Sequence, residues 1–348
     1  MTSADSLIGL VNPQPNSTIM IYDVHASESG ALAILDDLYK QIRIYSDKSV
    51  RWVFVVSTPD YEDTKEIMVR RFPWVKKNWG YRYYFDTVTT RKLLEEFKPD
   101  KVFSLQNKGI DFYKKEQLVY LHLPFILTDH KFTIKADGKK LWAYQNVISK
   151  SIFKSLRKVD MTIVQTEWMK EALIKKAGVY AEKIVVQQPD IKCNSIKSYV
   201  DCQENRKRIF YPATAFTYKN HMTLLKALDY ATKKGLKDYE VIFTIRPDEN
   251  GYSQQLYEYA MSNKLNIHFN GPISREKVFE MYAKSILVFP SYVESFGLPL
   301  LEAKLSGTYI IASDTPFCHE ILDGYDKAGF FGELDYQKLG DLILERIH

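Results

Sequence analysis

The sequence is short of the features that mark several classes of protein. It has only three cysteines, Cys193, Cys202 and Cys318, and none forms a CxxC pair or joins a histidine cluster, so neither a disulfide framework nor structural zinc is indicated. No apolar run is long enough to cross a bilayer, and residues 1–17 lack the pattern of a signal peptide. The net charge of +5 is too small to indicate binding to nucleic acid. We therefore expect a cytoplasmic protein, or one at the cytoplasmic face of the cell membrane.

Strand-like and helix-like segments alternate along the whole chain. The strand-like segments are 18–22, 52–56, 101–104, 118–121 and 161–165 in the first half, and 208–211, 240–245, 267–269, 286–289 and 309–312 in the second. The helix-like segments between them include 31–44, 167–177, 221–234 and 275–284. Such alternation is typical of parallel sheets with helices on both faces. The chain is long enough for two full cores, so the pattern predicts an α/β protein of two doubly wound, Rossmann-like domains facing each other across a cleft.

The join between these domains should lie in residues 187–206. Polar residues and Pro189 interrupt the strand–helix pattern there. We accordingly divide the chain into residues 1–188 and 189–348.

The most informative segment is 288–307, which reads VFPSYVESFGLPLLEAKLSG. An apolar strand leads into a Ser/Gly loop, Pro299 suits the first turn of a helix, and Gly307 suits its C-terminal cap. Backbone N–H groups at such a helix start form an anion site. Glu294 and Glu302 add carboxylates that bind neighbouring hydroxyls. A nucleotide sugar carries both phosphate and hydroxyls. The alternative is that Glu294 caps a loop or is simply solvated there, and that Glu302 merely favours a helix N-terminus.

Residues 271–320 resemble the C-terminal domain of the retaining glycosyltransferases of family 4, which have the GT-B fold. The resemblance rests on NGPISREKVFEMYAKSILVFPS, ESFGLPLLE and SGTYIIASDTPFCHE. Segments 211–228 and 163–191 also match, and the first half matches mainly in its pattern of elements. The resemblance implies an N-terminal acceptor-binding domain and a C-terminal donor-binding domain for the nucleotide sugar. In the family a last helix, here beginning near Asp335, often crosses back to the first domain.

The resemblance also implies roles for the residues around the glutamate pair. Glu294 would bind hydroxyls of the donor sugar, and Glu302 would hold the ribose. Ser295, Phe296 and Gly297 would offer backbone N–H groups to the phosphates and the sugar, since a glycine allows close approach.

Cations are needed to neutralise the pyrophosphate as it leaves. The resemblance assigns this task to Lys219, but Thr214 stands where the family has a second cation, an arginine. Arg246 is a substitute because it follows a strand whose end should face the ligand; the alternative is an ordinary surface arginine. Recognition of the base is expected around Gly271 and Ile273.

The first half supplies fewer candidates. Gly30 lies in the loop DVHASESGALAIL, where the family has a glycine-bearing loop that closes over donor and acceptor. His122, in VYLHLPF, matches a family histidine near the reacting sugar, and the alternative is a structural histidine. His25 is a lesser candidate. The donor half has no DxD-like motif, so we expect no metal and no other cofactor.

The implied function is retaining transfer of a sugar from a nucleotide diphosphate to a glycan or lipid-linked acceptor, in the synthesis of surface polysaccharide. Glu294 would orient the donor and stabilise charge, because the departing pyrophosphate oxygen can take the acceptor proton. One alternative is a nucleotide-sugar epimerase of the same fold. Another is a non-catalytic protein that binds a nucleotide sugar or carbohydrate. The absence of the family arginine at Thr214 is the main support for this alternative.

Two basic and aromatic stretches, 69–85 and 139–158, suggest peripheral contact with an anionic membrane. In the second, apolar residues share one helical face, a pattern that an ordinary helix with a buried face also shows. The first carries Phe72, Trp74 and Trp79 among basic residues and is the better candidate.

Overall fold

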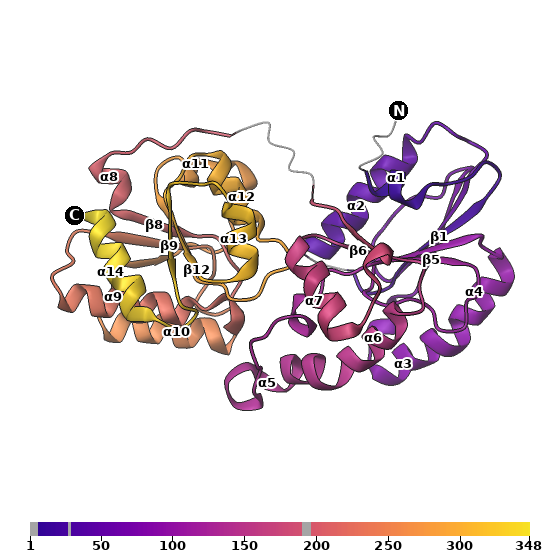
Figure 1. Ribbon diagram of the computed structural model, residues 1–348, viewed down its shortest axis with the longest axis horizontal. Helices are drawn as coiled ribbons and strands as arrows, with labels where there is room; N and C mark the ends of the chain where they lie inside the picture. The colour runs from indigo at the N-terminus through magenta and orange to yellow at the C-terminus, as the bar shows by residue number, and fades with distance from the viewer. Residues whose placement is uncertain (1–5, 27–28, 190–195) are drawn as a thin grey trace. The chain divides into compact units, whose positions relative to one another are not determined.

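The computed structural model describes residues 6–26, 29–189 and 196–348, which form two compact units (Figure 1). Unit 1 comprises Met1–Leu127 and Ala143–Pro189, and unit 2 comprises Thr128–Trp142 and Asp190–His348. The chain passes from the first series of strands to the second at Pro189. The short segment Thr128–Trp142 is an excursion, because it precedes the last strands of unit 1 in sequence but belongs to unit 2.

Unit 1 is built on a seven-stranded sheet in the order β3-β2-β1-β4-β5-β6-β7, and all of its pairs are parallel. The strands are β1 (Thr18–Asp23), β2 (Arg51–Val56), β3 (Ile67–Arg71), β4 (Lys101–Ser104), β5 (Glu116–Tyr120), β6 (Met161–Val164) and β7 (Ile184–Val186). The two edge strands, β3 and β7, were not predicted from the sequence. The first ends in two arginines and the second has three residues, so neither shows a long apolar run.

Helices cover both faces of this sheet. They are α1 (Leu7–Val11), α2 (Ser29–Arg43), η1 (Pro73–Lys76), α3 (Trp79–Tyr84), η2 (Phe85–Thr89), α4 (Thr90–Phe97), η3 (Pro124–Ile126), η4 (Tyr144–Ile148), α6 (Ser149–Leu156), α7 (Glu167–Ala177) and η5 (Ala181–Lys183). Successive residues of a strand point to opposite faces. Ile19 and Ile21 of β1 accordingly enter one core cluster, whereas Met20 and Tyr22 enter another. This is why the central strands are apolar throughout.

Unit 2 has a six-stranded parallel sheet in the order β10-β9-β8-β11-β12-β13. Its strands are β8 (Arg208–Tyr211), β9 (Glu240–Phe243), β10 (Ile267–Phe269), β11 (Ile286–Phe289), β12 (Ile310–Ser313) and β13 (Ala328–Phe331). Its helices are α5 (Ile134–Ala143), α8 (Gln203–Arg206), η6 (Thr217–Lys219), α9 (His221–Lys233), α10 (Gly251–Ser262), α11 (Arg275–Tyr282), α12 (Leu298–Leu305), α13 (Pro316–Leu322) and α14 (Tyr336–Ile347). The predicted fold class, two parallel Rossmann-like α/β domains, is confirmed.

The last helix, α14, packs on α9 within unit 2 (Figure 1). Gly340 makes the close approach: a Cβ at this position would lie 2.7 Å from Cδ1 of Tyr230 and 2.9 Å from the carbonyl oxygen of Ala227. Leu339, Ile343 and the other buried residues of α14 contribute to the core of this unit.

The order of the strands determines which loops lie beside a possible ligand site. In unit 2, β8 and β11 are neighbours, and the order of strands reverses between them. In unit 1 the same reversal occurs between β1 and β4. Loops at the carboxyl ends of strands beside such a switch point diverge and leave room for a ligand. Among the candidate residues, Gly30, Lys219 and Glu294 follow three of these strands, whereas His122 follows β5, Arg246 follows β9 and Gly271 follows β10.

Candidate functional site

The loops after β8 and β11 bring Lys219 and Glu294 together in unit 2. The Lys219 ammonium forms an ion pair with the Glu294 carboxylate, and both side chains are largely buried, with 17% and 15% exposed. The Ser291 hydroxyl donates to Glu294 Oε1 at 2.7 Å. The backbone N–H of Tyr292 donates to the carbonyl of Tyr218 at 3.2 Å and ties the two loops together. Two residues 75 positions apart in sequence thus form one charged pair at the switch point.

Asn220, which sequence analysis missed, holds the same loops in place. Its Nδ2 donates to the carbonyls of Pro290 at 3.1 Å and Glu333 at 2.6 Å, and its Oδ1 accepts from the Thr223 hydroxyl at 2.7 Å. Asn220 has φ of 60°, a left-handed conformation that asparagine adopts more readily than most residues. An asparagine immediately before a helix was the signal in the sequence.

The loop after β11 turns into α12 as the sequence predicted. Gly297 has φ of 91° and is the N-cap of α12, and Pro299 lies in the first turn. Gly307 has φ of 71° directly after the helix, as expected of a terminating glycine. Phe296 is buried and anchors the loop, while Ser295 is half-buried. The backbone of this loop lies at a helix N-terminus, the environment that favours an anion.

Glu302 is buried in α12 and bound at both carboxylate oxygens. Arg275 Nη2 lies 2.7 Å from Oε1, and the Tyr282 hydroxyl donates to Oε2 at 3.2 Å. Burial raises the pKa of Glu302, and Arg275 and Tyr282 oppose that rise. Neither partner was predicted from the sequence. Arg275 carried one usable signal, since a cation in the first turn of a helix opposes the helix dipole and calls for a compensating carboxylate.

Arg246 lies beside Gly271, in the segment expected to recognise the base. A Cβ on Gly271 would come within 2.9 Å of Cγ and Nε of Arg246, and Gly271 has φ of 69°. The Arg246 side chain is exposed, Ile273 is half-buried and Thr214 is exposed. The structure thus associates Arg246 with the expected base segment.

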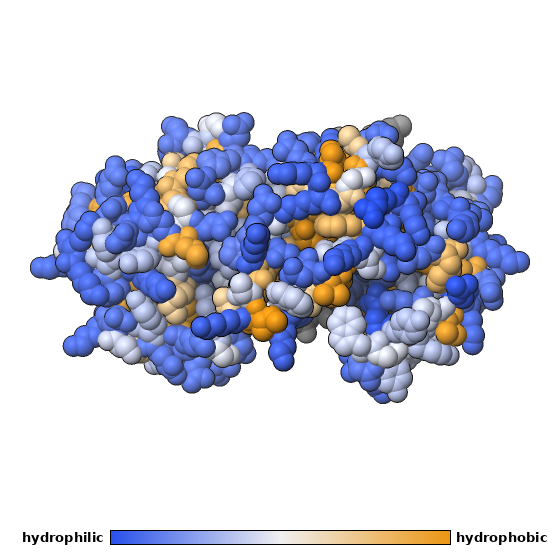
Figure 2. Space-filling model, turned by 60° about the horizontal axis from the view of Figure 1, so that its bottom comes forward, coloured by the Kyte–Doolittle hydropathy of each residue, from blue (hydrophilic) through white to orange (hydrophobic). Residues whose placement is uncertain are grey.

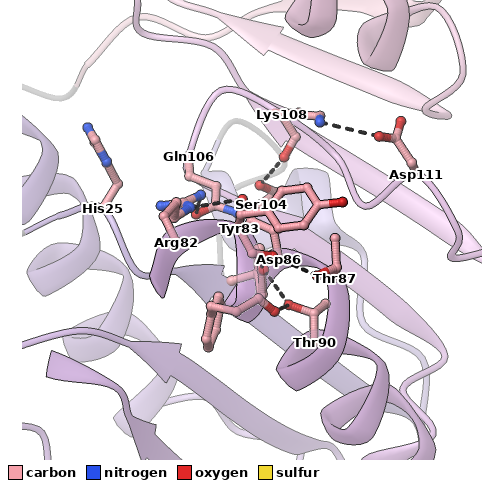
Figure 3. Close-up of polar contacts among 12 residues, drawn as sticks. His25, Arg82, Tyr83, Asp86, Thr87, Thr90, Ser104, Gln106, Lys108 and Asp111 are labelled. Carbon is pink, nitrogen blue, oxygen red and sulfur yellow. Dashed lines mark hydrogen bonds and ion pairs between the residues drawn. The ribbon is translucent and has the colours of Figure 1, made fainter. Parts of the chain in front are cut away.

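In unit 1, polar side chains gather near the carboxyl ends of β1 and β4 (Figure 3). Arg82 of α3 donates from Nε to Asp86 Oδ2 and from Nη2 to Gln106 Oε1, both at 2.9 Å. Asp23, the last residue of β1, accepts from the backbone N–H groups of His25 and Ala26 at 2.9 Å. Burial raises the pKa of Asp23. The strand-end rule could have identified Asp23 and Gln106, whereas Arg82 comes from a helix that sequence analysis did not predict.

His122 follows β5 and is held by Asn107, which follows β4. The His122 backbone N–H donates to Asn107 Oδ1 at 2.8 Å, and Asn107 Nδ2 lies 3.5 Å from His122 Nε2. His122 Nδ1 is buried and has no hydrogen-bond partner within the described residues. Burial, and then the nearby charge of His25, lowers the pKa of His122 to about 4. The imidazole is therefore neutral near pH 7. Gly30 is exposed in the first turn of α2, and a Cβ added there would meet no other atom within 4 Å.

Within the described part of the chain, the cysteines and possible metal ligands add no further site. Across residues 6–26, 29–189 and 196–348, no group of three His, Cys, Asp or Glu side chains is arranged to hold a metal ion. Cys202 and Cys318 are free thiols, and Cys193 lies outside the described residues.

Family models match both halves of the chain. Residues 196–347 match the model described as "Glycosyl transferases group 1", and residues 50–189 match "Glycosyltransferase Family 4". The O-antigen chain mannosyltransferase RfbU of Salmonella typhimurium is 26% identical over 222 residues, which are 61% of this chain and 60% of that protein. The alpha-monoglucosyldiacylglycerol synthase of Streptococcus pneumoniae is 23% identical over 327 residues, 86% of this chain and 72% of that one. The chain thus spans less than two thirds of the first of these relatives.

Solved structures share the fold. Anabaena HepE in complex with UDP-glucose superposes with a TM-score of 0.68 at 16% identity, covering 95% of this chain and 90% of that one. WaaG, a glycosyltransferase involved in lipopolysaccharide biosynthesis, gives 0.66 at 13% identity with the same coverage. At these identities the likeness shows the fold alone.

Proposed function

The chain belongs to the family 4-like glycosyltransferases of the GT-B fold, and we propose that it transfers a sugar from a nucleotide diphosphate to a glycan or lipid-linked acceptor with retention of configuration. The observation that carries this proposal is the Lys219–Glu294 pair beside the helix start of α12. It offers a cation for phosphate and a carboxylate for sugar hydroxyls at one place. Relatives named for O-antigen and glycolipid synthesis support a surface glycan or glycolipid as the product. A fold neighbour in complex with UDP-glucose supports a nucleotide sugar as the donor.

The chemistry assigns a limited task to each residue. The bond between the anomeric carbon and the phosphate oxygen breaks while the acceptor oxygen bonds to that carbon from the same face. The acceptor proton passes to the departing pyrophosphate oxygen. Lys219 stabilises the charge that develops there, Glu294 orients the sugar through its hydroxyls, and Glu302 holds the ribose. His122, neutral at the working pH, contributes hydrogen bonds near the sugar.

We also propose that transfer needs no metal, because Lys219 and the N-terminus of α12 supply positive potential for the phosphates. The remaining candidates, Ser295 to Gly297 by their backbone, Gly30 at the start of α2, and Arg246 near the base, complete the donor contacts. A non-catalytic nucleotide-sugar-binding protein is the second candidate, and the exposed Thr214 in place of a cation favours it. An epimerase would instead release nucleotide without an acceptor.

A thermal-shift screen against nucleoside diphosphates and their sugars tests donor binding. A ligand at about 100 times its Kd adds about 2.7 kcal/mol to the free energy of unfolding, which raises Tm by several degrees. One base should stand out from the others. Incubation with that nucleotide sugar and a candidate acceptor then separates the functions, since a transferase forms a new glycoside and a binding protein releases nothing. Failure of every nucleotide to shift Tm would contradict the proposal.

The exposed aromatic and basic residues of unit 1 are relevant to the expected membrane contact. No helix within the described residues is long and apolar enough to span a bilayer, and the face in Figure 2 shows hydrophobic residues in separated patches on a hydrophilic surface. Around α3, Trp79 and Tyr83 are 76% and 72% exposed and follow the exposed Lys76 and Lys77. Phe72 and Trp74, which sequence analysis grouped with them, instead pack against the core of unit 1.

The second stretch, 139–158, does not offer a free apolar face over its whole length. Ile152 and Leu156 are buried in the core of unit 1. The alternative of a helix with a buried face therefore holds for α6, and we propose that α3 makes the membrane contact.

Sedimentation with anionic liposomes tests this contact. Binding is expected at low salt and should weaken at high salt, because charges near the surface are screened. The double variant Trp79→Ser/Tyr83→Ser should bind less at low salt, since aromatic rings anchor at the interface. Tyr257→Ser, which removes a 40% exposed tyrosine from unit 2, is the matched control. Absence of binding by the unaltered protein at low salt would refute the contact.

A further inference from the structure

Arg275 is a cation in an unfavourable place. It is the first residue of α11, directly after the N-cap Ser274, where the helix dipole repels positive charge. Its guanidinium nevertheless stays there, 5.4 Å from the centre of the Phe279 ring and 2.7 Å from Glu302 Oε1. The Arg275 side chain is 54% exposed, whereas that of Glu302 is 6% exposed. Solvent alone does not explain this orientation, because the arginine reaches inward to a buried carboxylate.

The two partners of Glu302 leave it able to accept further hydrogen bonds. Arg275 contacts Oε1 and the Tyr282 hydroxyl donates to Oε2. Each carboxylate oxygen has two lone pairs, so both oxygens retain capacity after these contacts. Donors on both oxygens also fix the plane of the carboxylate. A fixed carboxylate with a remaining lone pair on each oxygen matches the two neighbouring hydroxyls of a ribose.

We propose that Arg275 is a positioning residue of the nucleotide site, which keeps the buried Glu302 an oriented carboxylate ready to accept the ribose hydroxyls. This inference rests on the proposed function, since it requires that a nucleotide binds at Glu302. Arg275 itself is assigned no contact with the nucleotide. Its effect on binding passes through Glu302.

Electrostatics gives the reason that such a residue is needed. Burial raises the pKa of Glu302, and Arg275 is the largest opposing influence, ahead of the Tyr282 hydrogen bond. Tyr282 stays protonated, because burial raises its own pKa well above the usual range. These two groups of α11 are the titratable groups that act on Glu302 in the described chain. The adjoining strands β11 and β12 carry uncharged side chains. Helix α13 carries Cys318, His319 and Glu320, and His319 is paired with Asp314.

Binding of the ribose is expected to depend on pH through the protonation of Glu302. Ribose binding needs the carboxylate, so it weakens as pH falls through the pKa of Glu302. Removing Arg275 removes the influence that lowers this pKa, and the midpoint of the loss therefore moves to higher pH. Well above that midpoint the variant should recover most of its ribose recognition. A purely structural role for Arg275 predicts no such recovery.

The experiment compares UDP with 2′,3′-dideoxy-UDP, by titration calorimetry between about pH 5 and about pH 9. Should UDP not bind, the nucleoside diphosphate selected by the thermal-shift screen replaces it. The terminal phosphate itself titrates at about pH 6. The quantity compared is the Kd of 2′,3′-dideoxy-UDP divided by the Kd of UDP, and the contribution of the phosphate cancels in this ratio. In the unaltered protein the ratio should be high and nearly constant around pH 7. In Arg275→Met it should fall by about tenfold for each pH unit below the new midpoint until the preference for ribose hydroxyls is lost.

Three further variants define the outcome. Lys277→Met removes an exposed cation from the same helix, one that is paired with Glu280, and should leave the ratio unchanged. Arg275→Lys keeps the charge and should restore much of the original pH profile. Glu302→Gln mimics the protonated carboxyl and should show a low ratio at every pH, equal to that of Arg275→Met at low pH.

Two failures are distinguishable. Absence of nucleotide binding by the unaltered protein would refute the proposed function itself. Normal binding with the same pH profile in Arg275→Met as in the unaltered protein would refute the role of Arg275 alone. If Arg275→Met does not fold, Arg275→Lys decides the matter through its folded form, because a flat, low ratio there would show that charge at this position is not what supports Glu302.

Discussion

Glu294→Gln is expected to lower kcat/KM for sugar transfer by about 10²- to 10³-fold, the range seen when one charge-stabilising group is removed from an active site. The glutamine keeps the size of the side chain and can still accept from the Ser291 hydroxyl. It loses the charge that pairs with Lys219 and that would bind two sugar hydroxyls in a planar fork. Initial rates of nucleotide release in the presence of acceptor measure the effect.

The control for this prediction is Glu258→Gln on α10. Glu258 accepts from Gln254 in an exposed i,i+4 pair and lies outside the candidate site, so transfer should be unaffected. Melting curves of both variants show whether the fold is intact. A folded Glu294→Gln protein with undiminished transfer would mean that the sugar is held elsewhere.

Lys219→Met should lower kcat by about 10²-fold or more, with a smaller effect on the apparent affinity for the nucleotide sugar. The reason is that the charge on the leaving phosphate develops in the transition state, where a positioned cation acts most strongly. The family arginine is absent at Thr214, so Lys219 has less support than its counterpart would have. The measurement is a comparison of kcat and KM for the donor at saturating acceptor.

Lys226→Met on the exposed side of α9 is the matched loss of charge and should have little effect. Thr214→Arg, added to Lys219→Met, should recover part of the lost rate, since it supplies a cation from the same loop. If Lys219→Met retains full kcat, the pyrophosphate must be neutralised by another group, and Arg246→Met would be the variant to examine next.

Much of the fold could be predicted because the local pattern is consistent. The helix predicted at 167–177 matches α7, and the ten predicted strands all occur within about a residue or two of their expected bounds. In β1, Ile21 points to one core and Tyr22 to the other. Because both faces of the strand are buried, the strand is recognisable in the sequence as an unbroken apolar run. The missed strands β3, β7 and β13 are edge strands. Edge strands bury fewer residues, so their composition carries a weaker signal.

The site divides in the same way. The turn from β11 into α12 was predictable, because Gly297, Pro299 and Gly307 each have a backbone geometry that their chemistry prefers. The partners of the charged residues were not. Arg275 and Glu302 are 27 positions apart and come together only because α11 packs on α12. The first-turn position of Arg275 indicates that a carboxylate is needed, but it does not identify Glu302 as that carboxylate.

By itself the sequence determined the α/β class, the two series of strands and the strand–loop–helix that presents Glu294 and Glu302, since each depends on periodicity or on the conformational preferences of single residues. Only the tertiary structure decided which charges meet. In the folded protein Lys219 pairs with Glu294, and Arg275 and Tyr282 contact Glu302. Asn220 donates a hydrogen bond to the neighbouring loop at Pro290. The physical reason is that Coulomb attraction and hydrogen bonding depend on distance in space and on burial. The distance between two charged side chains and their burial are set only when the sheets and helices have packed together.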